Sequence, residues 1–146
     1  MKTPSEILLV EDNEGDIELT RIAFEEGNLP CHISVARNGE EAMDFLEKRD
    51  AFASAPTPAL ILLDINMPRM DGIQFLKVVK ADPRFKMIPV IMLTSSGAPG
   101  DIKICYSLHA NCYIVKPNGV DQLVKMATQI ETFWSGLAKL PREAVA

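Results

Sequence analysis

Five short apolar runs are spaced along the chain, each about as long as a strand buried on both faces of a parallel sheet. They are residues 7–10, 32–36, 60–63, 89–93 and 112–115. A strand covered on both faces needs no polar side. The unbroken run at 7–10 therefore fits a strand buried on both faces, whereas the run at 32–36 is interrupted by His32 and Ser34.

Between the runs, apolar residues recur at the three- and four-residue spacing of amphipathic helices. We expect helices that begin after Asn13, Asn38 and Asp71, and two more at about 101–108 and 120–135. Strands that alternate with helices predict an α/β fold. Its doubly wound parallel sheet has right-handed crossovers and helices on both faces.

The composition fits one folded domain. The 146 residues are 47% hydrophobic and 24% charged, which is typical of a globular chain rather than a disordered one. We expect a single domain over 1–146, with a core at about 6–135 and a C-terminal tail at 136–146. The net charge of −5 argues against binding to nucleic acid or to an anionic membrane, since both need clustered basic residues.

No apolar run approaches the ~18 residues that a membrane span requires. The first run, 7–10, is followed at once by Glu11 and Asp12 and is too short for a signal peptide. We therefore expect a cytoplasmic protein.

The cysteines agree with a reducing compartment. Cys31, Cys105 and Cys112 are odd in number and lack C-x-x-C spacing, so neither a disulfide framework nor a zinc site is expected. We expect small buried thiols. A redox role for Cys105 and Cys112 is the alternative.

Distinctive polar residues follow four of the apolar runs. Glu11 and Asp12 follow the first run, Asp64 the third, Thr94 the fourth and Lys116 the fifth. Ligands of doubly wound sheets bind beyond the carboxyl ends of the strands, which lie at one edge. The pattern therefore predicts that these side chains form one site.

Three carboxylates at one edge repel one another, and a divalent cation relieves that repulsion. Mg²⁺ prefers oxygen ligands, including one or two carboxylates. We expect Asp12 and Asp64 as ligands, Glu11 as a ligand or as the holder of a bound water, and the Asn66 carbonyl as a further oxygen. Mn²⁺ is an alternative to Mg²⁺, and Ca²⁺ could occupy the site in crystals. Taken singly, each acid would be an ordinary surface residue; their combination with a Thr and a Lys at matching strand ends favours a site.

Asp64 is also a candidate nucleophile. A carboxylate can attack phosphorus to form an aspartyl phosphate, a reaction that depends on positioning and charge neutralisation. Lys116 and the metal supply positive charge, and the Thr94 hydroxyl can donate to a phosphoryl oxygen. Ser95 is small enough to leave room for the group.

Four segments resemble the bacterial response-regulator receiver family, and the resemblance extends over about 6–135. The segments are LLVED at 8–12, LLDINMPRMDG at 62–72, PVIMLTS at 89–95 and KP at 116–117. In this order and spacing they are highly specific. The resemblance implies a flavodoxin-like sheet in the order 2-1-3-4-5. It also implies phosphoryl transfer from a histidine kinase to Asp64, followed by slow self-catalysed hydrolysis. In that family the domain catalyses only its own phosphorylation and dephosphorylation, so no enzyme acting on other substrates is expected.

The resemblance further implies a switch. Thr94 moves toward the phosphoryl group, and the aromatic residue on the fifth strand, Tyr113, turns inward. The face formed by the fourth helix, fifth strand and fifth helix then carries the output. A cis peptide between Lys116 and Pro117 is implied as well, which proline permits.

The chain ends soon after its last expected helix, which leaves no room for a DNA-binding domain, so we expect output through a protein partner or through oligomerisation. Residues 108–113 (LHANCY), with FW at 133–134 and LP at 140–141, resemble the single-domain regulators of bacterial phytochrome histidine kinases. This implies a phytochrome-like kinase as partner. Trp134 and Leu137 add apolar content beyond the expected core. They predict a homodimer formed by the fourth helix, fifth strand, fifth helix and tail, with core burial as the alternative for Trp134.

Other interpretations remain at this point. A chemotaxis-type regulator or a phosphorelay intermediate is poorly separated from a phytochrome partner by sequence alone. A more distant alternative is a haloacid-dehalogenase-type phosphatase, which also uses an Asp nucleophile and Mg²⁺. Such enzymes need a second acid two residues after the nucleophile, where this chain has Asn66.

Overall fold

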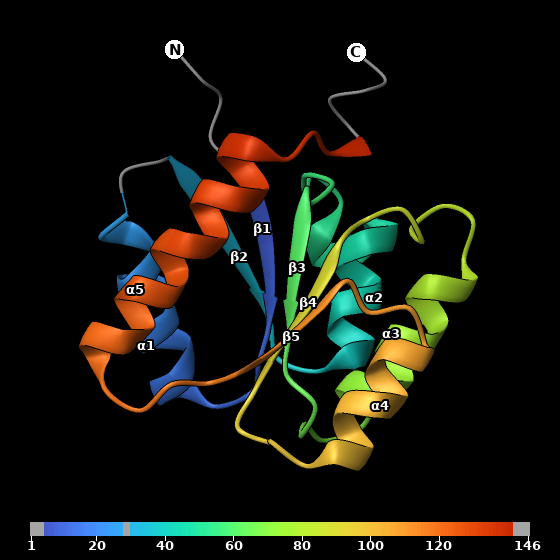
Figure 1. Ribbon diagram of the computed structural model, residues 1–146. Coiled ribbons are helices and arrows are strands. Elements are labelled where there is room, and N and C mark those ends of the chain that lie inside the picture. Colours follow the sequence, from blue (N-terminus) through green and yellow to red (C-terminus); the bar gives the residue numbers. More distant parts are fainter. Residues whose placement is uncertain (1–4, 28–29, 142–146) are drawn as a thin grey trace.

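The computed structural model describes residues 5–27 and 30–141. They form a five-stranded parallel sheet in the order β2-β1-β3-β4-β5, with helices on both faces (Figure 1). The strand order and the flanking helices confirm the flavodoxin-like α/β fold.

The bounds of the elements differ from the predicted ones by a few residues. The strands are β1 (Ser5–Val10), β2 (Cys31–Ala36), β3 (Leu60–Leu63), β4 (Val90–Thr94) and β5 (Cys112–Val115). The helices are α1 (Glu14–Glu25), α2 (Gly39–Glu47), α3 (Gly72–Ala81), α4 (Pro99–Ser107) and α5 (Val120–Ile130). A short 3₁₀ helix, η1 (Asp50–Phe52), lies in the long loop before β3.

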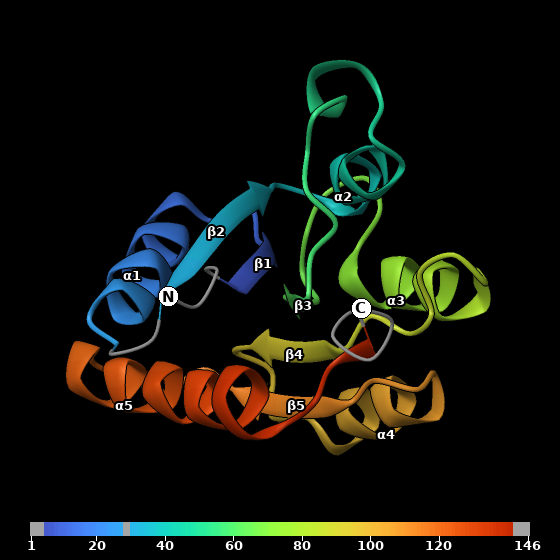
Figure 2. The same cartoon turned by 90° about the horizontal axis from the view of Figure 1, so that it is seen from above.

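The sheet separates two apolar cores. Helices α1 and α5 cover one face, and α2, α3 and α4 cover the other (Figure 2). Successive residues of β3 point to opposite faces: Ile61 and Leu63 pack beneath α2 and α3, and Leu60 and Leu62 pack toward α1 and α5. Because both faces are covered, the whole strand is buried, which explains its unbroken apolar sequence.

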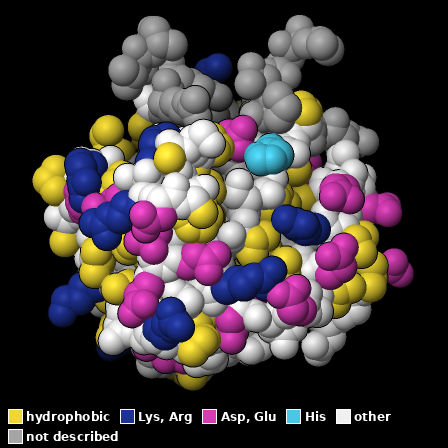
Figure 3. Space-filling view, turned by 180° about the vertical axis from the view of Figure 1, so that it is seen from behind, with side chains coloured by type: hydrophobic (Ala, Val, Ile, Leu, Met, Phe, Trp, Pro, Cys, Tyr) yellow, Lys and Arg dark blue, Asp and Glu magenta, His cyan; other side chains and the backbone are white. Residues whose placement is uncertain are grey.

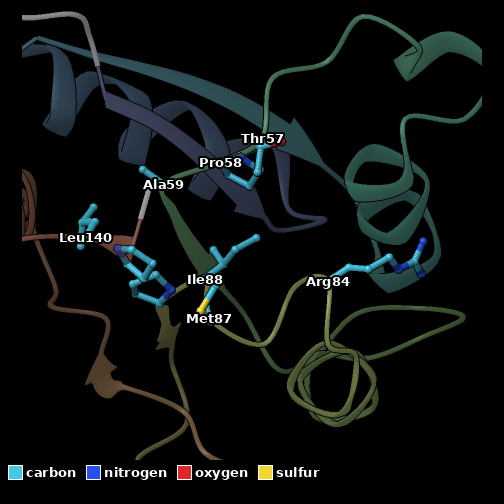
Figure 4. Close-up of a pocket in the computed structure, with 9 residues that line it drawn as sticks. Thr57, Pro58, Ala59, Arg84, Met87, Ile88 and Leu140 are labelled. Carbon is cyan, nitrogen blue, oxygen red and sulfur yellow. The ribbon is translucent and has the colours of Figure 1, made fainter. Parts of the chain in front are cut away.

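The end of the chain departs from the prediction of one continuous helix over 120–135. Helix α5 ends at Ile130, and a π-helical segment, η2 (Glu131–Leu137), continues from it. Hydrophobic spacing does not separate the two helix types, because π-turns appear inside α-helices. Beyond η2 the chain returns to the amino ends of β3 and β4. There Leu140 lines a pocket of about 310 Å³ with Ala59 and Ile88 (Figure 4).

The two core cysteines lie on opposite sides of the sheet. Cys105 is buried in the core beneath α2, α3 and α4, whereas Cys112 packs against the core toward α1 and α5. The sheet therefore keeps the two thiols apart, and a Cys105–Cys112 disulfide does not fit this fold. Burial raises the pKa of the Cys105 thiol to about 11, which suppresses its thiolate form.

The prediction of a cis peptide between Lys116 and Pro117 is wrong, because every described peptide bond is trans. The trans isomer before proline is favoured by about 0.5–1 kcal/mol. The turn into α5 is made by Gly119, whose φ of +94° lies in a region that glycine adopts without strain.

Among the described residues, no helix combines the length and apolar content needed to cross a membrane. On the face shown in Figure 3, Lys and Arg side chains lie among Asp and Glu side chains rather than in one basic area.

Candidate functional site

The carboxyl ends of the central strands bring the predicted site residues to one edge of the sheet. Val10 of β1 is in register with Leu63 of β3, so Glu11 and Asp64, the next residues, leave the sheet side by side. The Asp64 N–H also donates to the Val10 carbonyl at 3.0 Å. The topology alone therefore places these two carboxylates together.

Strands β4 and β5 deliver Thr94 and Lys116 in the same way. Thr94 is in register with Val115, and the N–H of Lys116 donates to the Thr94 carbonyl at 2.8 Å. The Thr94 side chain is completely buried. The hydroxyl and the ammonium predicted to act together are thus carried on adjoining strand ends.

Three carboxylates meet at this edge. Glu11, Asp12 and Asp64 each place an oxygen within 4.8 Å of the others. Glu11 is 2% exposed and Asp64 is 8% exposed, whereas Asp12 lies in solvent. The N–H groups of Asp12 and Asn13 both point at Glu11 Oε2, at 3.1 and 3.3 Å. The cluster is therefore part buried and held by the backbone.

The burial of Glu11 has an electrostatic cost. Removal from water, with the nearby Asp64 carboxylate adding to it, raises the pKa of Glu11 to about 7 although the Lys116 ammonium opposes the shift. A second positive charge beside Glu11 would relieve this cost. Carboxylate oxygens gathered at this separation are the donors that hard divalent cations take, so the residues present fit such an ion.

Lys116 is the cation of the site. Its ammonium hydrogen-bonds Glu11, donates to Asp16 Oδ2 at 3.1 Å and lies 3.6 Å from Asp64 Oδ2. Burial opposes its charge, but the hydrogen bond with Glu11 and the charge of Asp64 outweigh burial and raise the pKa of Lys116. The ammonium therefore stays charged beside the candidate acceptor.

Asp16 was not among the predicted site residues. It lies in the first turn of α1, and its N–H donates to the side chain of the N-cap residue Asn13 at 2.9 Å. A signal was present in the sequence, because the first turn of a helix that begins directly after Glu11-Asp12 must lie beside the same strand edge.

The loop after β3 is shaped by a close approach of α3. A Cβ on Gly72 would lie 1.9 Å from the carbonyl oxygen of Asp64, so only glycine fits. The Gly72 N–H donates to the Ile65 carbonyl at 2.9 Å, and the Ile65 N–H donates to Asp64 Oδ1 at 2.8 Å. These contacts fix the direction of the Asp64 side chain. Asn66, the next residue of the loop, is exposed.

The loop after β4 links Thr94 to the aromatic residue of β5. The Ser96 N–H donates to Thr94 Oγ1 at 3.4 Å, and the Tyr113 hydroxyl donates to the Ser96 carbonyl at 2.7 Å. Ser96 Oγ donates to Asp101 of α4 at 2.6 Å. Thr94 and Tyr113 are therefore joined through a single residue, Ser96.

Ser95 lies on the open side of the site. It is exposed and lines a hollow of about 230 Å³ together with Asp16, Lys116 and Gly119. Asp64 does not line this hollow, but Lys116 does, and its ammonium lies 3.6 Å from Asp64 Oδ2.

The predicted dimer residues are far from this edge. Trp134 is half-buried, packs against the core toward α1 and α5, and meets Phe133 edge to face with ring centroids 5.2 Å apart. Leu137 is 72% exposed. Both belong to η2, near the amino ends of the strands, at the top of Figure 1.

Comparison with known proteins agrees with this geometry. Residues 7–128 match the response regulator receiver domain. The chain is 38% identical over 138 residues to the response regulator Rcp1 of Synechocystis, covering 94% of each chain.

Solved structures of similar proteins superpose closely. The phosphorylated cyanobacterial phytochrome response regulator RcpA has a TM-score of 0.89 at 42% identity, over 95% of this chain and 99% of that one. The Mn²⁺-bound form of Rcp1 has a TM-score of 0.87 at 38% identity, over 94% and 99% of the two chains. The chain therefore belongs to the response regulator receiver family.

Proposed function

We propose that this protein accepts a phosphoryl group on Asp64 from a histidine kinase and signals through the shape change that follows. One observation carries the proposal: the nearly buried Asp64 carboxylate has an ammonium, Lys116 Nζ, 3.6 Å away and shares a carboxylate cluster suited to a divalent cation. Phosphoryl transfer needs little more from a protein than this positioning and neutralisation.

In the transfer, an Asp64 oxygen bonds to phosphorus as the bond from phosphorus to the kinase histidine nitrogen breaks. The leaving imidazole takes up a proton. The Lys116 ammonium moves to pair with the negatively charged phosphoryl oxygens, and the Thr94 hydroxyl turns to donate a hydrogen bond to one of them. The small side chain of Ser95 leaves room for the group.

The metal ligands we propose are Glu11, Asp12, Asp64 and the Asn66 carbonyl, holding Mg²⁺ or Mn²⁺. When bound, the ion neutralises charge on the phosphoryl group and on the acids around it. The Mn²⁺-bound form of the similar Rcp1 supports a divalent ion here.

The output follows from the hydrogen bonds around Ser96. A Thr94 side chain that turns toward a phosphoryl oxygen gives up its contact with the Ser96 N–H. The Ser96 carbonyl also accepts a hydrogen bond from the Tyr113 hydroxyl, and Ser96 Oγ donates to Asp101. A movement of Ser96 therefore moves residues of both β5 and α4. The surface of α4, β5 and α5 changes as a result.

For partners, we propose a phytochrome-type histidine kinase and a second copy of this chain. The phytochrome regulators among the similar proteins support the first. Exposed apolar side chains on α4, β5 and η2 support the second; they are Ile104, Tyr106, Val115, Phe133 and Leu137. The net charge of −5 supports a protein rather than nucleic acid as target, and a cytoplasmic location is consistent with these partners.

The function is tested by incubating the protein with acetyl phosphate and Mg²⁺ and measuring the intact mass. We expect one added phosphoryl group in the wild type and in a matched control, Asp121→Asn, in which an exposed acid of α5 is neutralised. Asp64→Asn should gain none. A wild-type protein without the adduct, or an Asp64→Asn variant that carries it, would refute the proposal.

The partner is tested by replacing acetyl phosphate with phosphorylated kinases. We expect faster transfer from a phytochrome-type kinase than from a chemotaxis-type kinase at equal concentration. Equal rates, or the reverse order, would contradict the phytochrome pairing and leave the acceptor role intact.

A further inference from the structure

Lys116 is shared among three carboxylates, and one of them has no part in the metal cluster. The ammonium hydrogen-bonds Glu11 and Asp16, the latter at 3.1 Å, whereas Asp64 lies at the longer distance of 3.6 Å. The acids that gather for a cation are Glu11, Asp12 and Asp64. The role of Asp16 therefore concerns the lysine and not the metal.

We propose that Asp16 is a positioning residue that restrains Lys116 on the α1 side of the site, away from the acceptor. The inference rests on the proposed phosphoacceptor function and adds a control on it. In this proposal Lys116 gives up its hydrogen bond to Asp16 when it turns toward a phosphoryl oxygen on Asp64. The strength of that bond then sets how readily the site is phosphorylated.

The backbone of Asp16 is well anchored. Its own N–H is held by Asn13 Oδ1 at 2.9 Å, and the next residue, Ile17, is buried in the core and donates its N–H to the Asn13 carbonyl. The first turn of α1 is therefore fixed at both the cap and the core. The Asp16 backbone therefore stays in place when the ammonium moves.

Lys116, in contrast, has room to move. Its flexible stem lies along the hollow of about 230 Å³ that Asp16 and Ser95 also line. The Lys116 side chain is 15% exposed and that of Asp16 is 43% exposed, so their ion pair lies at the rim of the site, where such pairs are modest in strength. A restraint of this strength can be broken by a phosphoryl group.

The sign of the effect follows. A phosphoryl group on Asp64 adds negative charge, which attracts Lys116 and is repelled by Asp16. Neutralising Asp16 removes both the competing hydrogen bond and the repulsion. We therefore expect Asp16→Asn to bind the phosphoryl analogue beryllofluoride about threefold more tightly and to react about threefold faster with acetyl phosphate, as suits a partly exposed pair.

The experiment measures beryllofluoride affinity by calorimetry at saturating Mg²⁺, and the acetyl phosphate reaction by intact mass against time. Asp16→Ser is a second variant without the carboxylate, and Asp16→Glu should return toward wild-type values. The matched control is Glu18→Gln, which removes one negative charge from an exposed position on the same helix, two residues away. Mg²⁺ affinity of each protein shows whether the metal cluster is intact.

The proposal holds if Asp16→Asn and Asp16→Ser gain affinity and rate while Glu18→Gln stays at wild type and Mg²⁺ affinity changes by less than about twofold. It is overturned if the Asp16 variants equal Glu18→Gln, or lose affinity for beryllofluoride. A wild type that neither binds beryllofluoride nor takes up phosphate overturns the proposed function, and this inference with it. A wild type that does both, with silent Asp16 variants, overturns the inference alone.

Discussion

Glu11 is a residue whose ionisation the fold alters strongly. Its pKa rises from 4.5 to about 7 because it is removed from water beside Asp64. Since the folded pKa is the higher one, folding favours the protonated form, and the metal-free protein loses stability as pH rises from about 4.5 through 7. A divalent cation has the opposite preference, because it binds the carboxylate.

Metal affinity should therefore depend on pH within the neutral range. At pH 6 most metal-free molecules carry the Glu11 proton, and at pH 8 few do, so we expect affinity for Mg²⁺ or Mn²⁺ to fall about tenfold between pH 8 and pH 6. Calorimetric titration with Mg²⁺ at several pH values measures this. Glu11→Gln should bind weakly with no such slope, and a wild-type affinity that is constant over this range would contradict the expectation.

The positions of single site residues could be predicted from the sequence where the sheet topology constrained them. Glu11, Asp64, Thr94 and Lys116 follow apolar runs, so their convergence depended only on the strands being parallel. The Lys116–Pro117 isomer was not predictable in this way. Proline permits both isomers, and no residue pattern in the sequence selects one.

At the scale of elements, β3 and α3 approach each other closely beside the site. This close approach depends on Gly72, because a Cβ there would overlap the backbone carbonyl of Asp64. Backbone atoms cannot rotate away as a side chain can, so a larger residue must move the helix or the strand.

We expect Gly72→Ala to lower the free energy of unfolding by about 3 kcal/mol, at the upper end of overpacking effects, and to slow phosphorylation through displacement of Asp64. Urea denaturation measures the first effect and intact mass the second. Gly100→Ala is the matched control: nothing lies within 4 Å of its added Cβ inside α4, and Ala suits a helix better by about 0.5–1 kcal/mol. Equal urea midpoints for Gly72→Ala and Gly100→Ala would contradict this expectation, because they would show that β3 and α3 can move apart at little cost.

Elements were predicted well when burial covered both faces and less well at their ends. The run at 60–63 matches β3 because every residue of it is buried. The prediction of helix to residue 135 missed the change to η2 at Glu131, since apolar spacing records which face is buried and not which carbonyl each N–H bonds.

At the scale of the whole molecule, the proposed homodimer rests on exposed apolar side chains. The proposed dimer face runs over α4, β5 and α5 and continues to η2, where Leu137 is the most exposed large apolar residue of the described chain. Trp134, by contrast, packs partly against the core, so core burial accounts for part of its role.

Light scattering at tens of micromolar should give about twice the chain mass of 16.1 kDa for the wild type, with or without beryllofluoride. Leu137→Glu should shift the population to monomer, because it places a charge in the contact. The matched control is Val78→Glu on α3, an exposed apolar residue away from that face. A monomeric wild type, or a Leu137→Glu variant that remains dimeric, would contradict the proposed interface.

The placement of η2 has a consequence for how a signalling assembly is arranged. Asp64 lies beyond the carboxyl ends of the strands, and η2 lies near their amino ends (Figure 1). A second copy that contacts this chain through Leu137 therefore leaves Asp64 uncovered. In a dimer joined in this way, Asp64 of each copy would remain accessible. A kinase could then phosphorylate both copies one after the other without dissociating the dimer.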